Sequence, residues 1–406
     1  MSVVAIRNCN FIKELTEGTD LSTGDLLFKD GVIAEIAPCG TAFEGVEEEI
    51  DANGMTAMPG LIDAHIHLTS IRDIIAEGCF VSDCTRAFES LNYAQTLLGL
   101  GYTTLRDCGE DKAYSVVATR DAINAGMFVG PRILCSGITM CPTEAGSLPE
   151  QDFGYMMPYN VDGPLEMRKY CRTNFAHGVD FIKLYGSGSM MGAGSNPGLP
   201  LFEDDEIIAA ASVAKQKESY CAIHCHGTDA IYQAVRLGVE TIEHASFIDD
   251  RALDILASKP NCGIVPTLSI TVDLIEHTDP NSDYGKRVIA KVSGLIGKIK
   301  EHLGHAYERG DVLIGWGTDV GINSYLREPG AEFRIRKEVY GWDNVELLKQ
   351  ATINSAKLCR IDDVTGSIKV GKCADVILVD GNPAEDLSIM YGGGAKHVFR
   401  AGVQYK

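Results

Sequence analysis

The central part of the chain alternates short apolar runs of β type with longer segments of helical periodicity. One such segment, Val288–Leu303, repeats apolar residues at helical spacing. Eight apolar runs occur, at residues 59–67, 103–106, 132–134, 181–184, 221–224, 241–244, 263–266 and 312–316. Eight strands that alternate with helices over about 300 residues are what a closed (β/α)₈ barrel requires.

An open doubly wound sheet is the alternative α/β arrangement. Sheets of that kind that bind dinucleotides open their first helix with a Gly-x-Gly-x-x-Gly turn, and no such turn follows the first predicted strand. We therefore predict a (β/α)₈ barrel of the TIM type over residues 59–359.

Both ends of the chain have a different sequence pattern, which predicts short strands joined by turns. The N-terminal part contains strand patterns at residues 3–6, 24–28 and 32–36, and Asp30-Gly31 is a typical hairpin turn between the last two. The C-terminal part contains similar patterns at Ser367–Val370, Val376–Val379 and His397–Arg400. We predict a small composite β-sandwich domain built from residues 1–58 plus 360–406.

Composition narrows the class of protein. The 406 residues carry a net charge of -20, which argues against nucleic-acid and anionic-membrane partners because both favour basic surfaces. We find no continuous apolar stretch of membrane-spanning length and no signal-peptide pattern at the N-terminus. The 13 cysteines are widely spread without Cys-x-x-Cys spacing, as expected for buried apolar residues. We expect a cytoplasmic homo-oligomer with a small-molecule substrate.

Side chains of metal-ligand type stand at the carboxyl ends of five predicted strands. His65 and His67 end the first strand. Because they are two residues apart on an extended strand, both imidazoles point to the same face. The later strands contribute Lys183, His224, His244 and Asp319. Each has a simpler explanation alone, such as a solvated lysine, a hydrogen-bonded core histidine or a helix cap. Barrel enzymes place their chemistry at this face, so the agreement of five strand ends favours a metal site.

The surrounding motifs resemble the successive signatures of the amidohydrolase superfamily. They are Pro59–His67, Phe181–Leu184, His224–Gly227, Ile242–Ala245, Gly317–Asp319 and Ala374–Asp380. Two further segments, Gly101–Asp107 and Ala176–Lys183, are most similar to the imidazolonepropionase-like and prolidase-like group. The resemblance covers nearly the whole chain. It is specific for a metal-dependent hydrolase and only weakly specific for a substrate.

The resemblance implies two zinc ions and a set of ligands from five strand ends: His65, His67, Lys183, His224, His244 and Asp319. The first two histidines and Asp319 would hold one ion, and the other two histidines would hold the second. Lys183, carboxylated to a carbamate, would bridge the two ions. A hydroxide shared between them would attack the substrate, and Asp319 would accept its proton and return it to the leaving nitrogen.

The predicted reaction is hydrolysis of an amide bond, in a dipeptide or an N-acyl amino acid. His226 is a candidate catalytic residue that donates to a substrate oxygen, and support of a metal ligand is its alternative role. Tyr185 and Arg327 are candidates to bind a substrate carboxylate, although Arg327 is equally typical of a solvated surface position. The alternative reactions are hydrolysis of a cyclic amide, of a lactone or of a phosphotriester. The alternative without catalysis is an inactive protein that keeps the barrel.

The loop after the third predicted strand departs from the resemblance. Many relatives carry a histidine there, whereas this chain reads Ile-Thr-Met-Cys-Pro-Thr-Glu at residues 138–144. The role of the loop Cys141–Tyr159 is therefore open, and Glu144 could favour a cationic group. The stretches Ser147–Tyr159 and Gly186–Leu201 have the composition of lids over the site.

Overall fold

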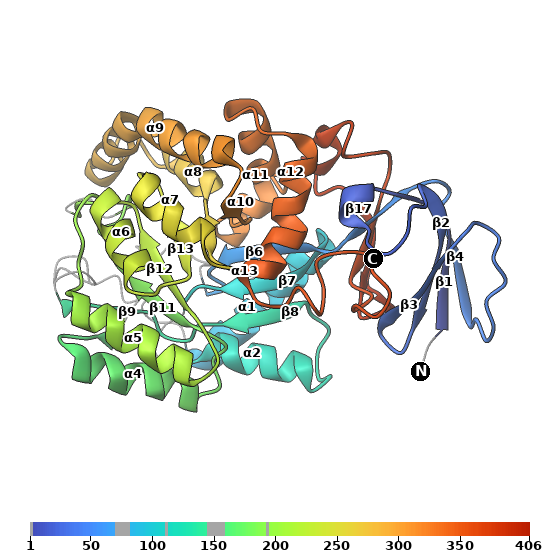
Figure 1. Ribbon diagram of the computed structural model, residues 1–406, viewed down its shortest axis with the longest axis horizontal. Helices are drawn as coiled ribbons and strands as arrows, with labels where there is room; N and C mark the ends of the chain where they lie inside the picture. Colours follow the sequence, from blue (N-terminus) through green and yellow to red (C-terminus); the bar gives the residue numbers. More distant parts are fainter. Residues whose placement is uncertain (1–2, 70–81, 110–112, 144–158, 192–194) are drawn as a thin grey trace.

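The computed structural model describes residues 3–69, 82–109, 113–143, 159–191 and 195–406. Within these ranges every apolar run predicted as a barrel strand is a β-strand (Figure 1). The strands are β6 (Leu61–Ile66), β7 (Tyr102–Asp107), β8 (Arg132–Cys135), β11 (Ile182–Tyr185), β12 (Cys221–Cys225), β13 (Thr241–His244), β14 (Gly263–Val265) and β15 (Leu313–Ile314). Each is parallel to its neighbours, and most of their residues are buried.

Backbone hydrogen bonds join these strands into a closed ring. β6–β8 form one parallel sheet and β11–β15 belong to another. At one junction the Asp180 N–H donates to the Cys135 carbonyl at 2.8 Å. At the other the Ala64 N–H donates to the Trp316 carbonyl at 2.8 Å. The predicted (β/α)₈ barrel is therefore confirmed.

Helices follow the strands and surround the barrel (Figure 1). Their bounds are α1 (Asp83–Gly99), α2 (Ser115–Asn124), α4 (Pro164–Ala176), α5 (Asp204–Gln216), α6 (Thr228–Arg236), α7 (Asp250–Ala257), α8 (Leu268–His277), α9 (Asp283–Arg309), α10 (Ile322–Arg327), α11 (Ala331–Arg334), α12 (Asn344–Lys349) and α13 (Ser355–Leu358). The helical spacing predicted for residues 288–303 lies within α9, whose Ser282 cap accepts a hydrogen bond from the Gly285 N–H. Together α8 and α9 insert a long helical pair between β14 and β15.

Strands from both ends of the chain form one composite β domain. They are β1 (Val3–Phe11), β2 (Thr23–Lys29), β3 (Val32–Ala37), β4 (Glu48–Asp51), β5 (Thr56–Pro59), β16 (Val376–Val379), β17 (Ala395–Arg400) and β18 (Val403–Gln404). β5 and β16 pair antiparallel, with Pro59 opposite Val376, and this pairing unites the two ends. Apolar residues from both ends share a core, including Phe28 and Phe399. The boundaries at residues 58 and 360 remain a prediction.

One predicted strand is wrong. Ser367–Val370 is not a strand, and Ile368 makes only an isolated bridge with Thr16. Gly366 and Gly371 flank the segment with φ of 92° each, so the backbone turns away on both sides before a ladder can extend.

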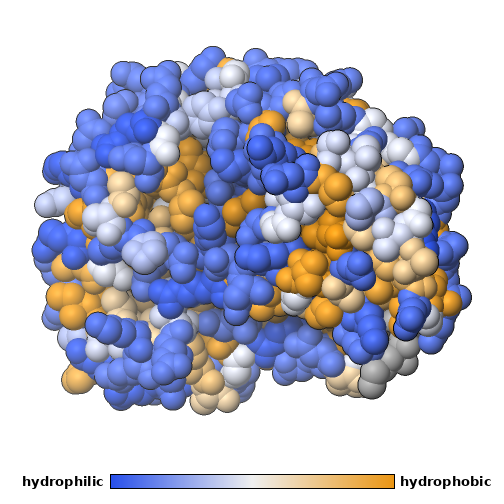
Figure 2. Space-filling view, turned by 45° about the vertical axis from the view of Figure 1, so that its right-hand side comes forward, coloured by the Kyte–Doolittle hydropathy of each residue, from blue (hydrophilic) through white to orange (hydrophobic). Residues whose placement is uncertain are grey.

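Surface and cysteines agree with the composition. Hydrophilic residues predominate on the face in Figure 2, with apolar residues in small groups between them. No helix in the described ranges has the length and apolarity needed to cross a membrane. The described cysteines are all free and most are buried; Cys141, expected in a loop, is buried in the short strand β9 (Met140–Cys141).

Candidate active site

The side chains predicted as metal ligands all lie at the carboxyl-terminal face of the barrel. Four of them are buried and belong to strands: His65 in β6, Lys183 in β11, His224 in β12 and His244 in β13. The other two are partly buried: His67 follows β6, and Asp319 lies in the turn after β15. The parallel strands bring them together because their carboxyl ends point the same way.

One group of possible ligands consists of His65, His67 and Asp319. The His65 Nε2 atom lies 3.6 Å from Asp319 Oδ1, and the His67 Nε2 atom lies 3.5 Å from the same oxygen. Their ligand atoms lie within 4.8 Å of one another, which is close enough for one ion. We call this group the first cluster.

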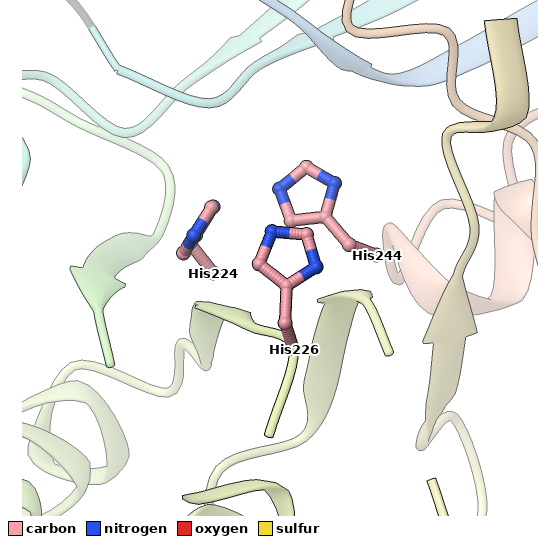
Figure 3. A group of neighbouring side chains, drawn as sticks. All are labelled: His224, His226 and His244. Carbon is pink, nitrogen blue, oxygen red and sulfur yellow. The ribbon is translucent and has the colours of Figure 1, made fainter. Parts of the chain in front are cut away.

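A second cluster consists of His224, His226 and His244. Their ligand nitrogens also lie within 4.8 Å of one another, and Figure 3 shows the three rings gathered at the ends of β12 and β13. The clusters adjoin, because the ring centroids of His65 and His244 are 4.9 Å apart. The structure thus brings His226 into the same group as two predicted ligands.

Lys183 lies beside both clusters. Its Nζ donates to the Cys108 carbonyl at 3.3 Å. Its positive charge also contributes to the lowered pKa of His67 and of His224, after the larger effect of burial for each. Lys183 stands on β11, the neighbour of β12, and the Sγ atom of its contact Cys108 lies within 4.8 Å of a His65 ring nitrogen.

The hydrogen bonds of the imidazoles fit a bound divalent ion. Four histidines make a hydrogen bond to a protein group through Nδ1, which leaves their Nε2 atom free to bind a metal ion. The pairs are His65 with Glu243 Oε2 at 2.6 Å, His67 with the Gly109 carbonyl at 2.8 Å, His226 with Ser246 Oγ at 2.7 Å and His244 with Thr267 Oγ1 at 2.6 Å. His224 is reversed, with Nε2 3.4 Å from the Gly188 carbonyl. Imidazole nitrogens oriented in this way are typical zinc ligands.

Burial keeps most of these imidazoles neutral. Burial and the charge of Lys183 lower the pKa of His67 to about 3. Burial and the charge of Lys291 lower the pKa of His226 to about 3. Burial and the neighbouring histidines likewise hold the pKa of His244 well below its usual range. Neutral imidazole is the form that binds metal, so the electrostatics of these three histidines agree with the donor geometry. His65 differs: burial lowers its pKa, but the neighbouring Cys108 and Asp319 outweigh that effect and raise it to about 10.

Asp319 is held in an unusual backbone conformation. Its φ is 56° and that of His244 is 68°, in the left-handed region that non-glycine residues seldom adopt. Such strain concentrates at functional sites, where the surrounding structure maintains it. Burial raises the pKa of the Asp319 carboxyl, and the charges of His65 and Lys183 oppose that effect.

Asp63 supports this turn, and sequence reasoning did not assign it a role. Its buried carboxylate accepts hydrogen bonds from the Tyr325 hydroxyl, from Thr318 Oγ1 at 2.7 Å and from the His65 N–H at 3.0 Å. It therefore ties the first barrel strand to the residue before Asp319. An aspartate inside an apolar strand was the available signal, since buried carboxylates need several partners.

A cavity of about 430 Å³ opens beside the second cluster. Its polar part includes His224, His226, His244 and Asp319. Its apolar part comes from α8, α9 and the segment after β11: Met190, Met191, Leu268, Ile270, Leu274, Ile299 and Leu303. A bound molecule would thus meet ligand-type groups on one side and an apolar wall on the other. The sequence did not indicate the contribution of α8 and α9, because helix periodicity does not tell which neighbour a face meets.

The three predicted substrate contacts have different positions. His226 lines this cavity, and Tyr185 stacks on His224 with ring centroids 4.1 Å apart. Arg327 is exposed, pairs with Asp273 at 3.1 Å and lines a different cavity with Tyr325. The structure thus gathers two of the three around the histidines.

Part of the predicted covering lies outside the described residues. This applies to Glu144 and to residues 147–158 of the first predicted lid. The second predicted lid is described except for residues 192–194, and its Met190 and Met191 line the cavity.

The closed barrel gathers side chains of metal-ligand type at its carboxyl-terminal face, which is where barrel enzymes place their active sites. The model of the Amidohydrolase family matches residues 56–404, and the chain belongs to this family. Proteins of the family generally bind metal ions.

Relatives agree with this family assignment. Ochratoxinase of Aspergillus niger is 26% identical over 96% of this chain and 84% of its own. A probable imidazolonepropionase of Danio rerio is 21% identical over 91% of this chain and 84% of its own. A solved structure described as a Xaa-Pro dipeptidase with bound methionine has 27% identity and a TM-score of 0.87, over 100% of both chains. The chain is a hydrolase that acts on carbon–nitrogen bonds.

Proposed function

We propose that this hydrolase uses two zinc ions to cleave the amide bond of a dipeptide or an N-acyl amino acid. The observation that carries the proposal is the pair of adjoining ligand clusters, in which protein groups already occupy the second nitrogen of each imidazole. The likeness to a Xaa-Pro dipeptidase supports the substrate class.

The first cluster would hold one ion, and His224 and His244 would hold the other. Lys183 would bridge the two sites after its neutral Nζ adds to carbon dioxide and releases a proton, which forms a carbamate with two oxygens. Zinc ions bound there would supply Lewis-acid activation of water and of the amide carbonyl.

Asp319 is the proposed proton carrier. Its carboxylate would accept a proton from the attacking water and deliver it to the leaving nitrogen. Burial raises the pKa of this carboxyl, which brings it closer to the pH at which it must both accept and donate.

His226 is the proposed contact for a substrate oxygen. It lines the cavity, and its bond to Ser246 leaves Nε2 for another partner. The cavity opens beside the imidazoles, and its empty space of about 430 Å³ includes open solvent at the mouth. Its apolar wall would suit an apolar side chain next to the amide bond.

One observation favours a second candidate, hydrolysis of a neutral cyclic amide. Arg327 lines a different cavity, and the described residues that line the histidine cavity include neither lysine nor arginine. A free carboxylate normally needs such a cation or a cluster of donors. The relative described as a probable imidazolonepropionase supports this alternative.

A substrate panel separates the candidates. The protein would be loaded with zinc in bicarbonate, and its metal content measured before assay. Dipeptides and N-acyl amino acids would be tested with free and amidated carboxyl groups, beside cyclic amides, lactones and phosphotriesters. A strong preference for the free carboxylate supports the peptidase assignment. Equal rates on both forms exclude it, and turnover of the cyclic amide alone supports the second candidate.

A further inference from the structure

A buried ion pair lies directly behind the first cluster. Arg106 and Glu243 each have 0% exposure. The Arg106 Nη2 group donates to Glu243 Oε1 at 2.7 Å, and Glu243 Oε2 lies 2.6 Å from His65 Nδ1. Three strands, β7, β13 and β6, thus contribute one residue each to a continuous chain of hydrogen bonds.

The other two nitrogens of the Arg106 guanidinium also have partners. Its Nε donates to the Ala64 carbonyl at 2.5 Å, and its Nη1 donates to Thr241 Oγ1 at 3.1 Å. Thr241 Oγ1 in turn donates to Glu243 Oε1 at 3.0 Å. A buried ion pair needs additional hydrogen bonds of this kind, and those made to Glu243 determine the orientation of its carboxylate.

His65 differs from the other histidines in the charge of its partner. The Nδ1 atoms of His67, His226 and His244 meet a carbonyl or a hydroxyl group. Only His65, among the four described histidines of the clusters that use Nδ1, faces a carboxylate. A carboxylate accepts a hydrogen bond from the Nδ1–H group, which sets the tautomer and makes Nε2 a stronger electron-pair donor to a metal ion.

We propose that Glu243, held by Arg106, is a positioning residue that keeps the proton of His65 on Nδ1 and directs Nε2 at the ion in the first cluster. This inference rests on the proposed metal centre. Two buried full charges fit such a role, because replacing a buried ion pair with apolar residues is often neutral or stabilising.

The test is metal affinity in Glu243→Gln, which keeps the shape of the side chain and removes its charge. The full chain, stripped of metal, would be titrated with Co²⁺ in bicarbonate and followed by its visible absorption. One of two binding events should weaken about 10- to 100-fold, the range typical for partners of metal ligands. Thr267→Val, which removes the neutral partner of His244, is the matched control and should leave that event unchanged.

The outcomes separate the two proposals. A wild-type chain that binds no metal overturns both. Two normal binding events in a folded Glu243→Gln variant overturn only the role of Glu243, and so does equal weakening of the same event by Thr267→Val.

A second measurement covers the case in which Glu243→Gln does not fold. In the zinc-loaded wild-type chain with ¹⁵N-labelled histidine, NMR should show several Nδ1-protonated rings, and the signal of one of them should be absent in His65→Asn. An Nε2-protonated His65 overturns the proposal.

Discussion

The two clusters differ in how the fold assembles them. The second cluster comes from β12 and β13, which are neighbours in one sheet, with Cys225 opposite His244. The first cluster lies across the junction between the first and last barrel strands, where the Asp319 N–H donates to the His65 carbonyl at 2.9 Å. The second cluster thus needs one pair of strands in register, whereas the first needs the closed barrel.

The clusters also differ in charge. The first contains a carboxylate and has Glu243 behind His65, whereas the second consists of imidazoles with hydroxyl or carbonyl partners. A site that contains carboxylates attracts a divalent ion more strongly than a site that contains only neutral ligands. We therefore expect the first cluster to bind its ion more tightly, and to lose it when barrel closure is disturbed.

Replacing Lys183 with Ala should have the largest effect, because this lysine is next to members of both clusters. We expect hydrolysis to fall below detection and metal content to fall below two ions per chain. Added short carboxylic acids should restore part of both, because their oxygens can replace a carbamate. Elemental analysis and rate assays check this, and full activity with both metals in the variant would exclude the bridge.

The variant Asp319→Asn should have the next largest effect on hydrolysis. The amide keeps an oxygen near His65 and His67 but cannot accept the proton, so turnover should fall by roughly two to four decades. Metal content should fall much less than kcat. An unchanged kcat would move the proton carrier to another residue, with His226 the first to examine.

The stability of the metal-free chain should depend on pH through histidines of both clusters, among them His67 and His226. The pKa values of His67 and His226 are about 3 in the fold, against an ordinary 6.5. The unfolded chain therefore binds more protons between these values, and stability should fall as pH drops from about 6.5 toward 3.

Each group should contribute about 1.4 kcal/mol per pH unit at most. Urea unfolding at several pH values measures the slope, and His67→Asn or His226→Asn should each reduce it. A slope that neither variant changes would contradict the prediction.

Asp63→Ala should affect the first cluster and spare the second. The change leaves Tyr325 and Thr318 without an acceptor, and one unpaired buried polar group costs about 1–3 kcal/mol. Urea unfolding of the metal-free chain and Co²⁺ titration measure stability and affinity. Ser246→Ala, at the partner of His226, is the control in the second cluster and should cost less. An equal loss of Co²⁺ affinity in both clusters of Asp63→Ala would show that the clusters do not assemble separately.

Arg327→Ala should have the smallest effect. The side chain is exposed and paired with Asp273, and such pairs contribute about 1 kcal/mol or less. We expect unchanged kcat/KM on substrates with free and with blocked carboxyl groups. A selective loss on the free form would instead return Arg327 to the substrate site.

Local patterns predicted most of the fold. Apolar runs between helix-length segments predicted the barrel strands, because strand and helix periodicity depend on near neighbours in the sequence. The Ser367–Val370 pattern failed because the glycines on either side end the pairing. The predicted ligands could be placed at one face because parallel strands share a direction, and their roles stay predictions.

The sequence by itself determined which strands form and which ligand-type side chains stand at their ends. Only the tertiary structure decided that Asp63 meets Thr318 from 255 residues away, and that Arg106 reaches Glu243 from 137 residues away. It also decided that Arg327 turns to Asp273, and that α8 and α9 wall the cavity. These contacts join strands and helices distant in the chain. The local patterns predicted a closed barrel, but which side chains meet when it closes depends on packing between distant elements, which no local pattern contains.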